Sequence, residues 1–203
     1  MRYLLTWYGI TDLRASMGFE AQGPVLGALA SGQFDCVKIL AYTKKTDFSA
    51  EELAEQQETI QFLLQNREAM AALPYRESMH YVDVLANTPA GHRFFQNWLE
   101  KRLEEAALKV DISMQECVLK ELNDTEGIYF AVLNLLKEVP ESEAEITFYL
   151  SPGTPVMAFS WALAMLASPK RKIRLLASPD SRKGLQTIEI TQGIIDNIKS
   201  NWR

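Results

Sequence analysis

Short strand-like runs and longer helix-like runs alternate along almost the whole chain, and this alternation limits the fold more than any other feature. The strand-like runs are rich in β-branched and aromatic residues, and residues 37–41 form an almost unbroken apolar run. Strands that are apolar on both faces are typical of parallel sheets covered by helices on each side. We therefore expect an α/β, Rossmann-like fold, with a mostly parallel central sheet and helices on both faces.

The expected elements follow from apolar periodicity and from capping and turn residues. Strands are expected at residues 2–8, 35–42, 80–85, 110–122, 145–150, 171–177 and 185–190. Helices are expected at residues 24–30, 49–72, 94–108, 125–138, 154–168 and 192–202. The stretch that joins the first strand to the first of these helices is expected to be a polar loop. The helix at 154–168 is apolar on nearly every face, which predicts a central, buried position.

With 203 residues, of which 47% are hydrophobic, the chain is long enough for one well-cored domain. We expect this domain to span residues 1–190, with residues 49–91 as an elaboration of the core. Residues 191–203 are expected to form a closing helix that leads towards a further, missing domain.

Charge and composition exclude several classes of protein. The net charge of −5 argues against general binding to duplex DNA, which requires a basic face. Cys36 and Cys117 lie in apolar runs without metal-ligand spacing, so we expect buried thiols, no metal and no cofactor. The N-terminus does not resemble a signal peptide, and the apolar run at 155–167 is too short to cross a bilayer. A cytoplasmic protein is expected.

The turn Ser151-Pro152-Gly153-Thr154-Pro155 joins a buried strand directly to the apolar helix. Thr154 suits the N-cap of that helix and Pro155 suits its first turn. A helix N-terminus at the carboxyl edge of a parallel sheet presents free N–H groups and a partial positive charge, which favour phosphate. The turn therefore predicts an anion site, and the alternative is a strand-to-helix turn that holds no ligand.

Three further loops follow predicted strands and should reach the same edge of the sheet. They add the candidate ligand contacts Gly9, Ile10, Thr11, Asp12, Lys44, Ser178 and Arg182. The first of these loops lacks the glycine spacing of a dinucleotide site, so an ordinary NAD site is not expected. Asp12 beside a polyanion requires a donor, which is either a ribose hydroxyl or a backbone amide. The alternative role for the basic side chains is a solvated loop.

The strand, turn and helix at residues 146–167 resemble the second signature of CARF domains, the Rossmann-like sensors associated with CRISPR defence. The run Ile173-Arg174-Leu175-Leu176-Ala177-Ser178-Pro179 is similar to the part that follows in that family. It most resembles the sensor domain of the transcriptional activators of RNA-repair operons. The resemblance covers residues 109–180 well and residues 2–42 in general terms.

The resemblance implies a CARF-like ligand-sensing domain that forms a homodimer around a two-fold pocket. The implied ligand is a cyclic oligoadenylate or an RNA end that carries a phosphate, and the implied role is control of an effector in antiviral defence or RNA repair. Ser151, Gly153 and Thr154 would hold phosphate, Thr11 would orient a ribose, and Lys44 or Arg182 would close over the ligand. Two alternatives remain, namely a metal-independent ring nuclease that cleaves the ligand and a dimerisation module without ligand.

Overall fold

The computed structural model describes residues 1–141, 144–178 and 184–201 of the chain. Within this part, one six-stranded sheet has the strand order β3-β2-β1-β4-β5-β6. All neighbouring strands are parallel except β6, which runs antiparallel to β5. The strands are β1 (Arg2–Trp7), β2 (Cys36–Thr43), β3 (Asp111–Val118), β4 (Glu145–Tyr149), β5 (Ile173–Ala177) and β6 (Gln186–Ile188). The predicted α/β, Rossmann-like fold with a mostly parallel sheet is confirmed.

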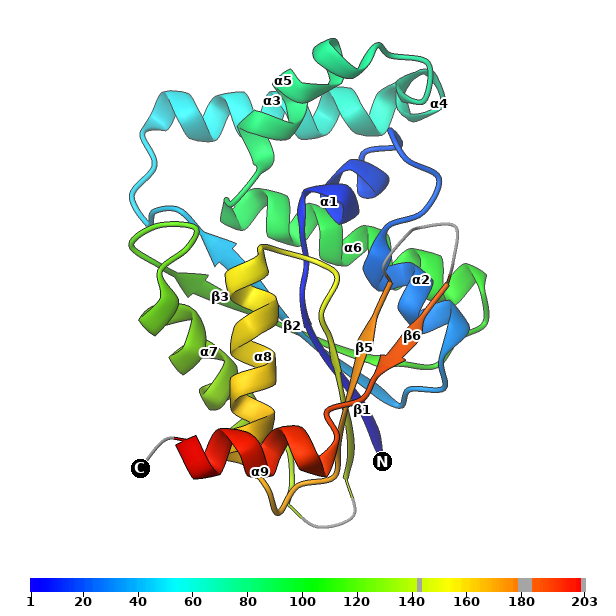
Figure 1. Ribbon diagram of the computed structural model, residues 1–203. Helices are drawn as coiled ribbons and strands as arrows, with labels where there is room; N and C mark the ends of the chain where they lie inside the picture. Colours follow the sequence, from blue (N-terminus) through cyan, green and yellow to red (C-terminus); the bar gives the residue numbers. More distant parts are fainter. Residues whose placement is uncertain (142–143, 179–183, 202–203) are drawn as a thin grey trace.

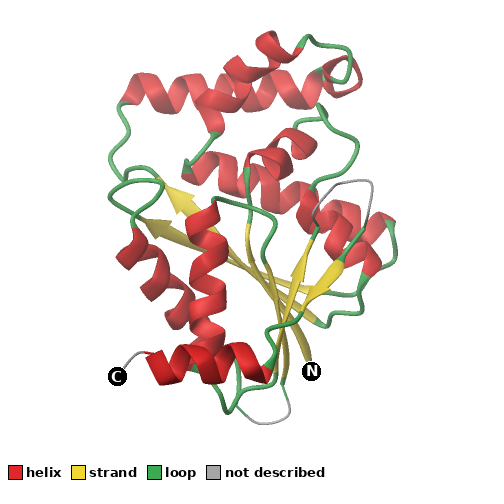
Figure 2. Cartoon of the chain, viewed as in Figure 1, coloured by secondary structure: helices red, strands yellow, loops and turns green. Residues whose placement is uncertain are grey.

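Helices cover both faces of the sheet (Figure 1, Figure 2). One face carries α1 (Ile10–Ser16), α2 (Pro24–Ser31) and α6 (Pro89–Glu105), with α3 (Ala50–Gln65), α4 (Arg67–Met70) and α5 (Tyr75–Leu85) further out. The other face carries α7 (Thr125–Lys137) and α8 (Pro155–Ala167). The last helix, α9 (Gln192–Asn201), lies at the foot of the molecule, at the end opposite α3. The expected end of this helix at Trp202 lies outside the described residues.

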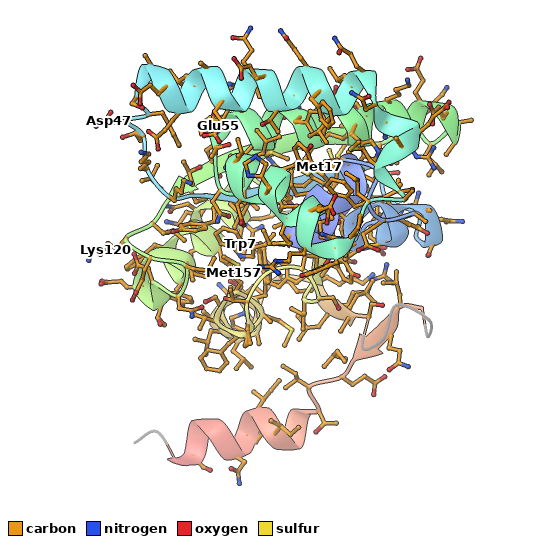
Figure 3. The ribbon with its side chains drawn as sticks, turned by 90° about the horizontal axis from the view of Figure 1, so that it is seen from above. Trp7, Met17, Asp47, Glu55, Lys120 and Met157 are labelled. Atoms are coloured by element: carbon orange, nitrogen blue, oxygen red, sulfur yellow. The ribbon has the colours of Figure 1, made fainter. Side chains whose placement is uncertain are left out.

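Two apolar cores lie on the two faces of the sheet. Successive side chains of a strand point to opposite faces, so β1 contributes Leu4 to the core beneath α6 and Leu5 and Trp7 to the core beneath α8. All three side chains are fully buried. Trp7 lies beside Met157 of α8, as Figure 3 shows. The central strands β1, β2 and β4 are therefore buried on both sides, as their apolar sequences predict, whereas the edge strands β3 and β6 are largely exposed.

The predicted strand at residues 80–85 is wrong, because these residues belong to helix α5. Ser78, Val82 and Leu85 are buried, and their spacing of four and three residues marks one face of a helix. The apparent alternation of apolar and polar residues in this run covers too few residues to distinguish the two periods.

Two other expectations about helices also differ from the structure. The expected loop after β1 contains helix α1, whose short length hides its periodicity in the sequence. The expected helix at 49–72 is interrupted at Asn66, where α3 ends and α4 begins. The capping box of Ser49 and Glu52 is present at the start of α3, as the sequence predicts.

Helix α8 is not buried on every side, in contrast to the prediction from its composition. Met157, Trp161 and Ala164 are buried against the sheet and α7. Phe159, on the same helix, is 57% exposed. The helix is thus a covering element of the sheet with one free apolar face.

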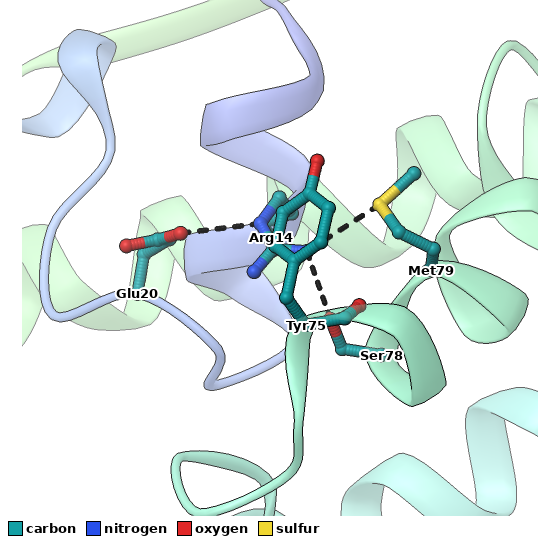
Figure 4. Close-up of polar contacts among 5 residues, drawn as sticks. All are labelled: Arg14, Glu20, Tyr75, Ser78 and Met79. Carbon is teal, nitrogen blue, oxygen red and sulfur yellow. Dashed lines mark hydrogen bonds and ion pairs between the residues drawn. The ribbon is translucent and has the colours of Figure 1, made fainter.

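A buried arginine links α1 to α5 (Figure 4). The Arg14 guanidinium donates to the Ser78 hydroxyl at 2.9 Å and pairs with the Glu20 carboxylate at 3.1 Å. It also lies over the Tyr75 ring, 4.6 Å from the ring centroid, where the cation meets the negative face of the π-system. This contact fixes α1, the helix that begins at the candidate site.

Candidate functional site

The sheet reverses its strand order beside β1, because the chain passes from β1 to β2 on one side and returns as β4 on the other. Ligands of open α/β sheets bind at such a switch point, at the carboxyl ends of the strands. A cavity of about 270 Å³ lies at this point, near the lower end of the range for small-molecule sites. It is lined by Gly9, Ile10, Thr11, Asp12, Ser151, Pro152, Gly153 and Thr154, all predicted from the sequence as ligand contacts.

The two predicted turns approach each other closely. A Cβ atom built on Gly9 would lie 3.1 Å from the backbone nitrogen of Gly153, so a larger residue at position 9 would push the turns apart. Gly153 has a φ of 91°, a conformation that residues with a Cβ rarely adopt. A Cβ at this position would also lie only 2.6 Å from the Met157 sulfur. Both glycines are therefore required for the shape of the cavity.

The β4–α8 turn ends in the cap that the sequence predicts. The Thr154 side chain accepts a hydrogen bond from the Met157 N–H at 3.3 Å, and Pro155 occupies the first turn of α8. The backbone N–H of Val156 has no partner within the described part of the chain. The N-terminus of α8 thus offers a free donor beside the cavity.

Ser151 has a structural contact in addition to its place in the cavity wall. Its hydroxyl accepts a hydrogen bond from the Ser178 N–H and donates to the Ser178 carbonyl at 3.2 Å. These two bonds tie the β4–α8 turn to the end of β5. Ser178 does not line the cavity, so it supports the turn from behind.

Asp12 caps backbone amides, which is one of the two roles considered for it from the sequence. Its carboxylate accepts from the Val25 N–H at 2.8 Å and from the Gly9 N–H at 3.1 Å. The side chain is fully buried, and burial raises the pKa of Asp12 to about 7, against the effect of the two amides. Asp12 therefore joins the starts of α1 and α2 at the wall of the cavity.

The Thr11 hydroxyl has no hydrogen-bond partner among the residues that the structure describes, although Thr11 lines the cavity. Ile10 is 43% exposed at the same rim. The first turn thus presents one free hydroxyl and one apolar side chain.

Of the two predicted basic residues, only Lys44 lies in the described part of the chain, and it does not line the cavity. The Lys44 side chain is exposed, and its backbone N–H donates to the Asn87 carbonyl at 3.0 Å. Arg182 lies outside the described residues.

A buried polar chain that the sequence reasoning missed begins at Tyr8. The Tyr8 hydroxyl shares a short hydrogen bond with Nδ1 of His92, whose Nε2 lies 3.0 Å from the Thr43 hydroxyl. Tyr8 also stacks on Phe95, with ring centroids 4.5 Å apart. Tyr8 lines the cavity, so this chain connects its wall to α6.

The Tyr8 phenol and the His92 imidazole are both uncharged at neutral pH. Burial, with help from the Arg93 charge, lowers the pKa of His92 to about 4. Burial raises the pKa of Tyr8 far above its ordinary value, and the carboxylates of Asp12 and Glu116 act in the same direction. A neutral phenol held by a neutral imidazole is therefore a fixed polar group at the cavity wall.

The cavity also contains residues for which the sequence offers only weak signals. Its remaining lining residues are Leu13, Pro24, Tyr42, Asn87, Leu122 and Met157. Tyr8 and Tyr42 stand at the ends of β1 and β2, a position that could have marked them. Asn87 and Leu122 lie in loops that are distant in sequence from the β1–α1 and β4–α8 turns, so only folding brings them to the cavity.

Among the described residues, no group of histidine, cysteine or acidic side chains could hold a metal ion. No helix in the described ranges has the length and apolar character needed to cross a membrane.

Comparison with known proteins shows the fold. No protein-family model matches the chain, and no curated protein matches it. Among solved structures, it is similar to Csm6 of Enterococcus italicus bound to cyclic hexa-2'-fluoro-hexa-dAMP, with a TM-score of 0.50 and 16% identity. The match covers 100% of this chain and 40% of that chain, so the chain spans well under half of the Csm6 protein. The chain therefore shares its Rossmann-like α/β fold with this structure.

Proposed function

We propose that this chain is a sensor that binds a cyclic oligonucleotide, first of all a cyclic oligoadenylate, in the cavity between the β1–α1 and β4–α8 turns. The observation that carries the proposal is the meeting of these turns at the switch point, with the free N-terminus of α8 beside the cavity. The likeness to Csm6, whose structure contains a cyclic hexa-adenylate analogue, supports this class of ligand. An RNA end that carries a phosphate shares the same chemistry and is the competing ligand.

In this proposal, each turn has a distinct role. The Val156 N–H and the Thr154 hydroxyl, at the positive end of α8, bind a phosphate oxygen. The free Thr11 hydroxyl meets a ribose hydroxyl from the opposite turn. The exposed Lys44 side chain and Arg182 close over the ligand, and the bound ring controls an effector in CRISPR-type defence or RNA repair.

Titration calorimetry with cyclic oligoadenylates of four and six units and with phosphate-ended RNA tests the proposal. We expect a cyclic oligoadenylate to bind most tightly, and Thr154→Val to weaken that binding because a hydroxyl contact and a cap worth about 1 kcal/mol are lost. Ser31→Ala, a hydroxyl loss at the exposed end of α2, is the control and should leave binding unchanged. If Thr154→Val bound the cyclic oligoadenylate as tightly as the unaltered chain, the β4–α8 turn would not be part of the ligand site.

The same incubations separate a sensor from an enzyme. A ring nuclease aligns the ribose 2'-hydroxyl with its own phosphate and stabilises the developing charge, and this chemistry requires no metal. A sensor leaves the ring intact after prolonged incubation. A linear product with a 2',3'-cyclic phosphate would assign the ring nuclease instead, and absence of any binding would favour the dimerisation module.

We further propose that the chain forms a homodimer along the free apolar face of α8. Phe159 and Ile188 are 57% and 41% exposed, and with Leu163 they line a shallow apolar depression of about 1080 Å³. Exposed apolar surface of this kind marks interaction sites. The N-terminus of α8 lines the ligand cavity and Phe159 follows about one turn later, so contact along α8 would bring two cavities together.

Analytical ultracentrifugation tests the dimer. Phe159→Asp places a carboxylate in the apolar depression, so we expect it to weaken self-association by at least about ten-fold. Phe130→Asp, at a residue of α7 that is 51% exposed and lies outside that depression, is the matched control. A dimer that persists in Phe159→Asp would place the interface elsewhere.

A further inference from the structure

One end of the ligand cavity has no role in the proposed phosphate and ribose contacts. It is formed by Tyr42 at the end of β2, Asn87 between α5 and α6, and Leu122 in the loop before α7. An aromatic ring, an amide and an apolar side chain are the groups with which proteins hold a nucleobase. None of these three residues is among the ligand contacts expected from the sequence.

The sheet determines the distance between this end and the β4–α8 turn. β2 and β4 are the two neighbours of β1, and strands in a sheet lie about 4.8 Å apart. The ends of β2 and β4 are therefore separated by about 10 Å. In the register, Trp7 pairs with Leu40 and Thr6 pairs with Tyr149, so Tyr42 and Ser151 project beyond β1 at similar heights. If a phosphate lies at the end of β4, the base of the same nucleotide can therefore reach the end of β2.

The backbone of Asn87 holds an uncommon conformation at this point. Its φ is 58°, in the left-handed region that asparagine tolerates better than most residues with a Cβ. The Lys44 N–H binds its carbonyl at 3.0 Å, and Thr88 then caps α6 by accepting from the Gly91 N–H at 3.1 Å. The backbone of Asn87 is thus held between Lys44, at the end of β2, and the start of α6.

Two polar groups at this end of the cavity are free for a ligand. The Asn87 amide and the Tyr42 hydroxyl have no hydrogen-bond partner in the described ranges of the chain. Both residues are only partly buried. A bound base would supply the missing partners without displacing any protein contact.

We infer that Tyr42, Asn87 and Leu122 form a base subsite that selects adenine, an inference that rests on the proposed binding of a cyclic oligonucleotide. An amide offers one acceptor and one donor side by side, and adenine offers the matching N6 donor and N7 acceptor. Guanine and hypoxanthine offer two acceptors, O6 and N7, which a single amide cannot satisfy together. Tyr42 and Leu122 hold the plane of the base. Asn87 lies in the segment 49–91, so the elaboration of the core supplies the specificity.

Binding of cyclic oligonucleotides that carry either adenine or hypoxanthine bases tests the inference. The probes are cyclic tetra- and hexa-adenylate and the corresponding cyclic inosine oligonucleotides, titrated into the unaltered chain and into Asn87→Gly. Glycine suits a φ of 58°, so this variant removes the amide while keeping the backbone. We expect the unaltered chain to prefer adenine by about ten-fold or more, and Asn87→Gly to bind both rings with equal, weaker affinity.

Two further variants complete the experiment. Asn87→Asp keeps the shape but replaces the donor with a second acceptor, so it should also lose the preference for adenine. Asn66→Gly removes the amide of a helix-end asparagine outside the cavity, and it should keep the preference. Thermal unfolding of each variant confirms that it is folded.

The outcomes separate this inference from the proposed function. The subsite would be contradicted if cyclic adenylates and cyclic inosine oligonucleotides bound equally well, or if the preference for adenine survived in Asn87→Gly. Either outcome would leave the proposed sensor function intact. If no ring binds to the unaltered chain, both the sensor and the subsite are wrong.

Discussion

The two faces of the sheet are built from different chemistry. The face beneath α1 and α6 contains buried polar and charged groups, including Asp12, Arg14, Thr43 and His92. The face beneath α7 and α8 is almost wholly apolar. There the indole N–H groups of two buried tryptophans, at positions 7 and 161, have no partner among the described residues.

The difference shows how this fold positions a site. Hydrogen bonds are directional, so those on the face beneath α1 and α6 hold the β1–α1 turn, Tyr8 and Asn87 in defined positions. Apolar packing is less directional, so the face beneath α7 and α8 contributes mainly stability. Three changes test this division, from the largest expected effect to the smallest.

Removal of a large side chain from the apolar face should have the largest effect. Trp161 is fully buried and packs against Phe148, with ring centroids 4.7 Å apart. We expect Trp161→Ala to lower the free energy of unfolding by about 3–5 kcal/mol, because it leaves a cavity. Urea denaturation measures the change. Phe130→Ala on α7, where the ring is 51% exposed, should cost less than about 1 kcal/mol. Similar losses in both variants would contradict the buried position of Trp161.

Removal of the buried arginine tests the polar face. Arg14→Ala deletes the hydrogen bond to Ser78 and the stacking on Tyr75, so we expect a loss of about 2 kcal/mol in the free energy of unfolding. Arg14→Lys keeps the charge but not the planar stack, and it should recover only part of the loss. Hydrogen exchange should speed up in α5 and not in α7. A uniform effect on both helices would mean that Arg14 does not specifically fix α5 to α1.

A pH titration tests the polar chain at the cavity wall. The pKa of His92 falls from its ordinary value of 6.5 to about 4 on folding, so the unfolded chain takes up a proton first as the pH decreases. The contribution of His92 to stability is thus complete above pH 6.5 and declines towards pH 4, by about 2 kcal/mol at pH 5.

His92→Gln provides the reference, because it cannot titrate in this range. The raised pKa of Asp12 acts in the opposite direction, since its contribution falls as the pH rises towards 7. The difference between the unaltered chain and His92→Gln cancels that effect and isolates the histidine. A difference that does not change between pH 7.5 and pH 5 would contradict a neutral, buried His92.

Much of the candidate site could be predicted from the sequence. Gly153, Thr154 and Pro155 carry local signals of a turn and a helix start, and local signals survive in any tertiary context. The rule that parallel strands meet at one edge then brought the first loop to the same place. The resemblance to CARF domains specified the ligand class, which stays a proposal.

Other parts could not be predicted because their signals are weak or shared. The run at 80–85 fits both a strand and a helix over so few residues, and burial of Val82 and Leu85 against the core selected the helix. Tyr8 and His92 are separated by 84 positions, and no local pattern indicates their hydrogen bond. The role of Ser151 as an anchor for Ser178 also depends on two strands lying side by side.

By itself, the sequence determined the alternation of strands and helices, the parallel sheet and the capped turn before α8. These depend on period, propensity and capping, which act within a few residues. Only the tertiary structure decided that Asp12 caps two helices, that Lys44 holds the backbone of Asn87, and that Tyr42 and Asn87 share a cavity with Gly153. The physical reason is that strand order and helix packing set distances between residues far apart in the chain, and no local pattern encodes them.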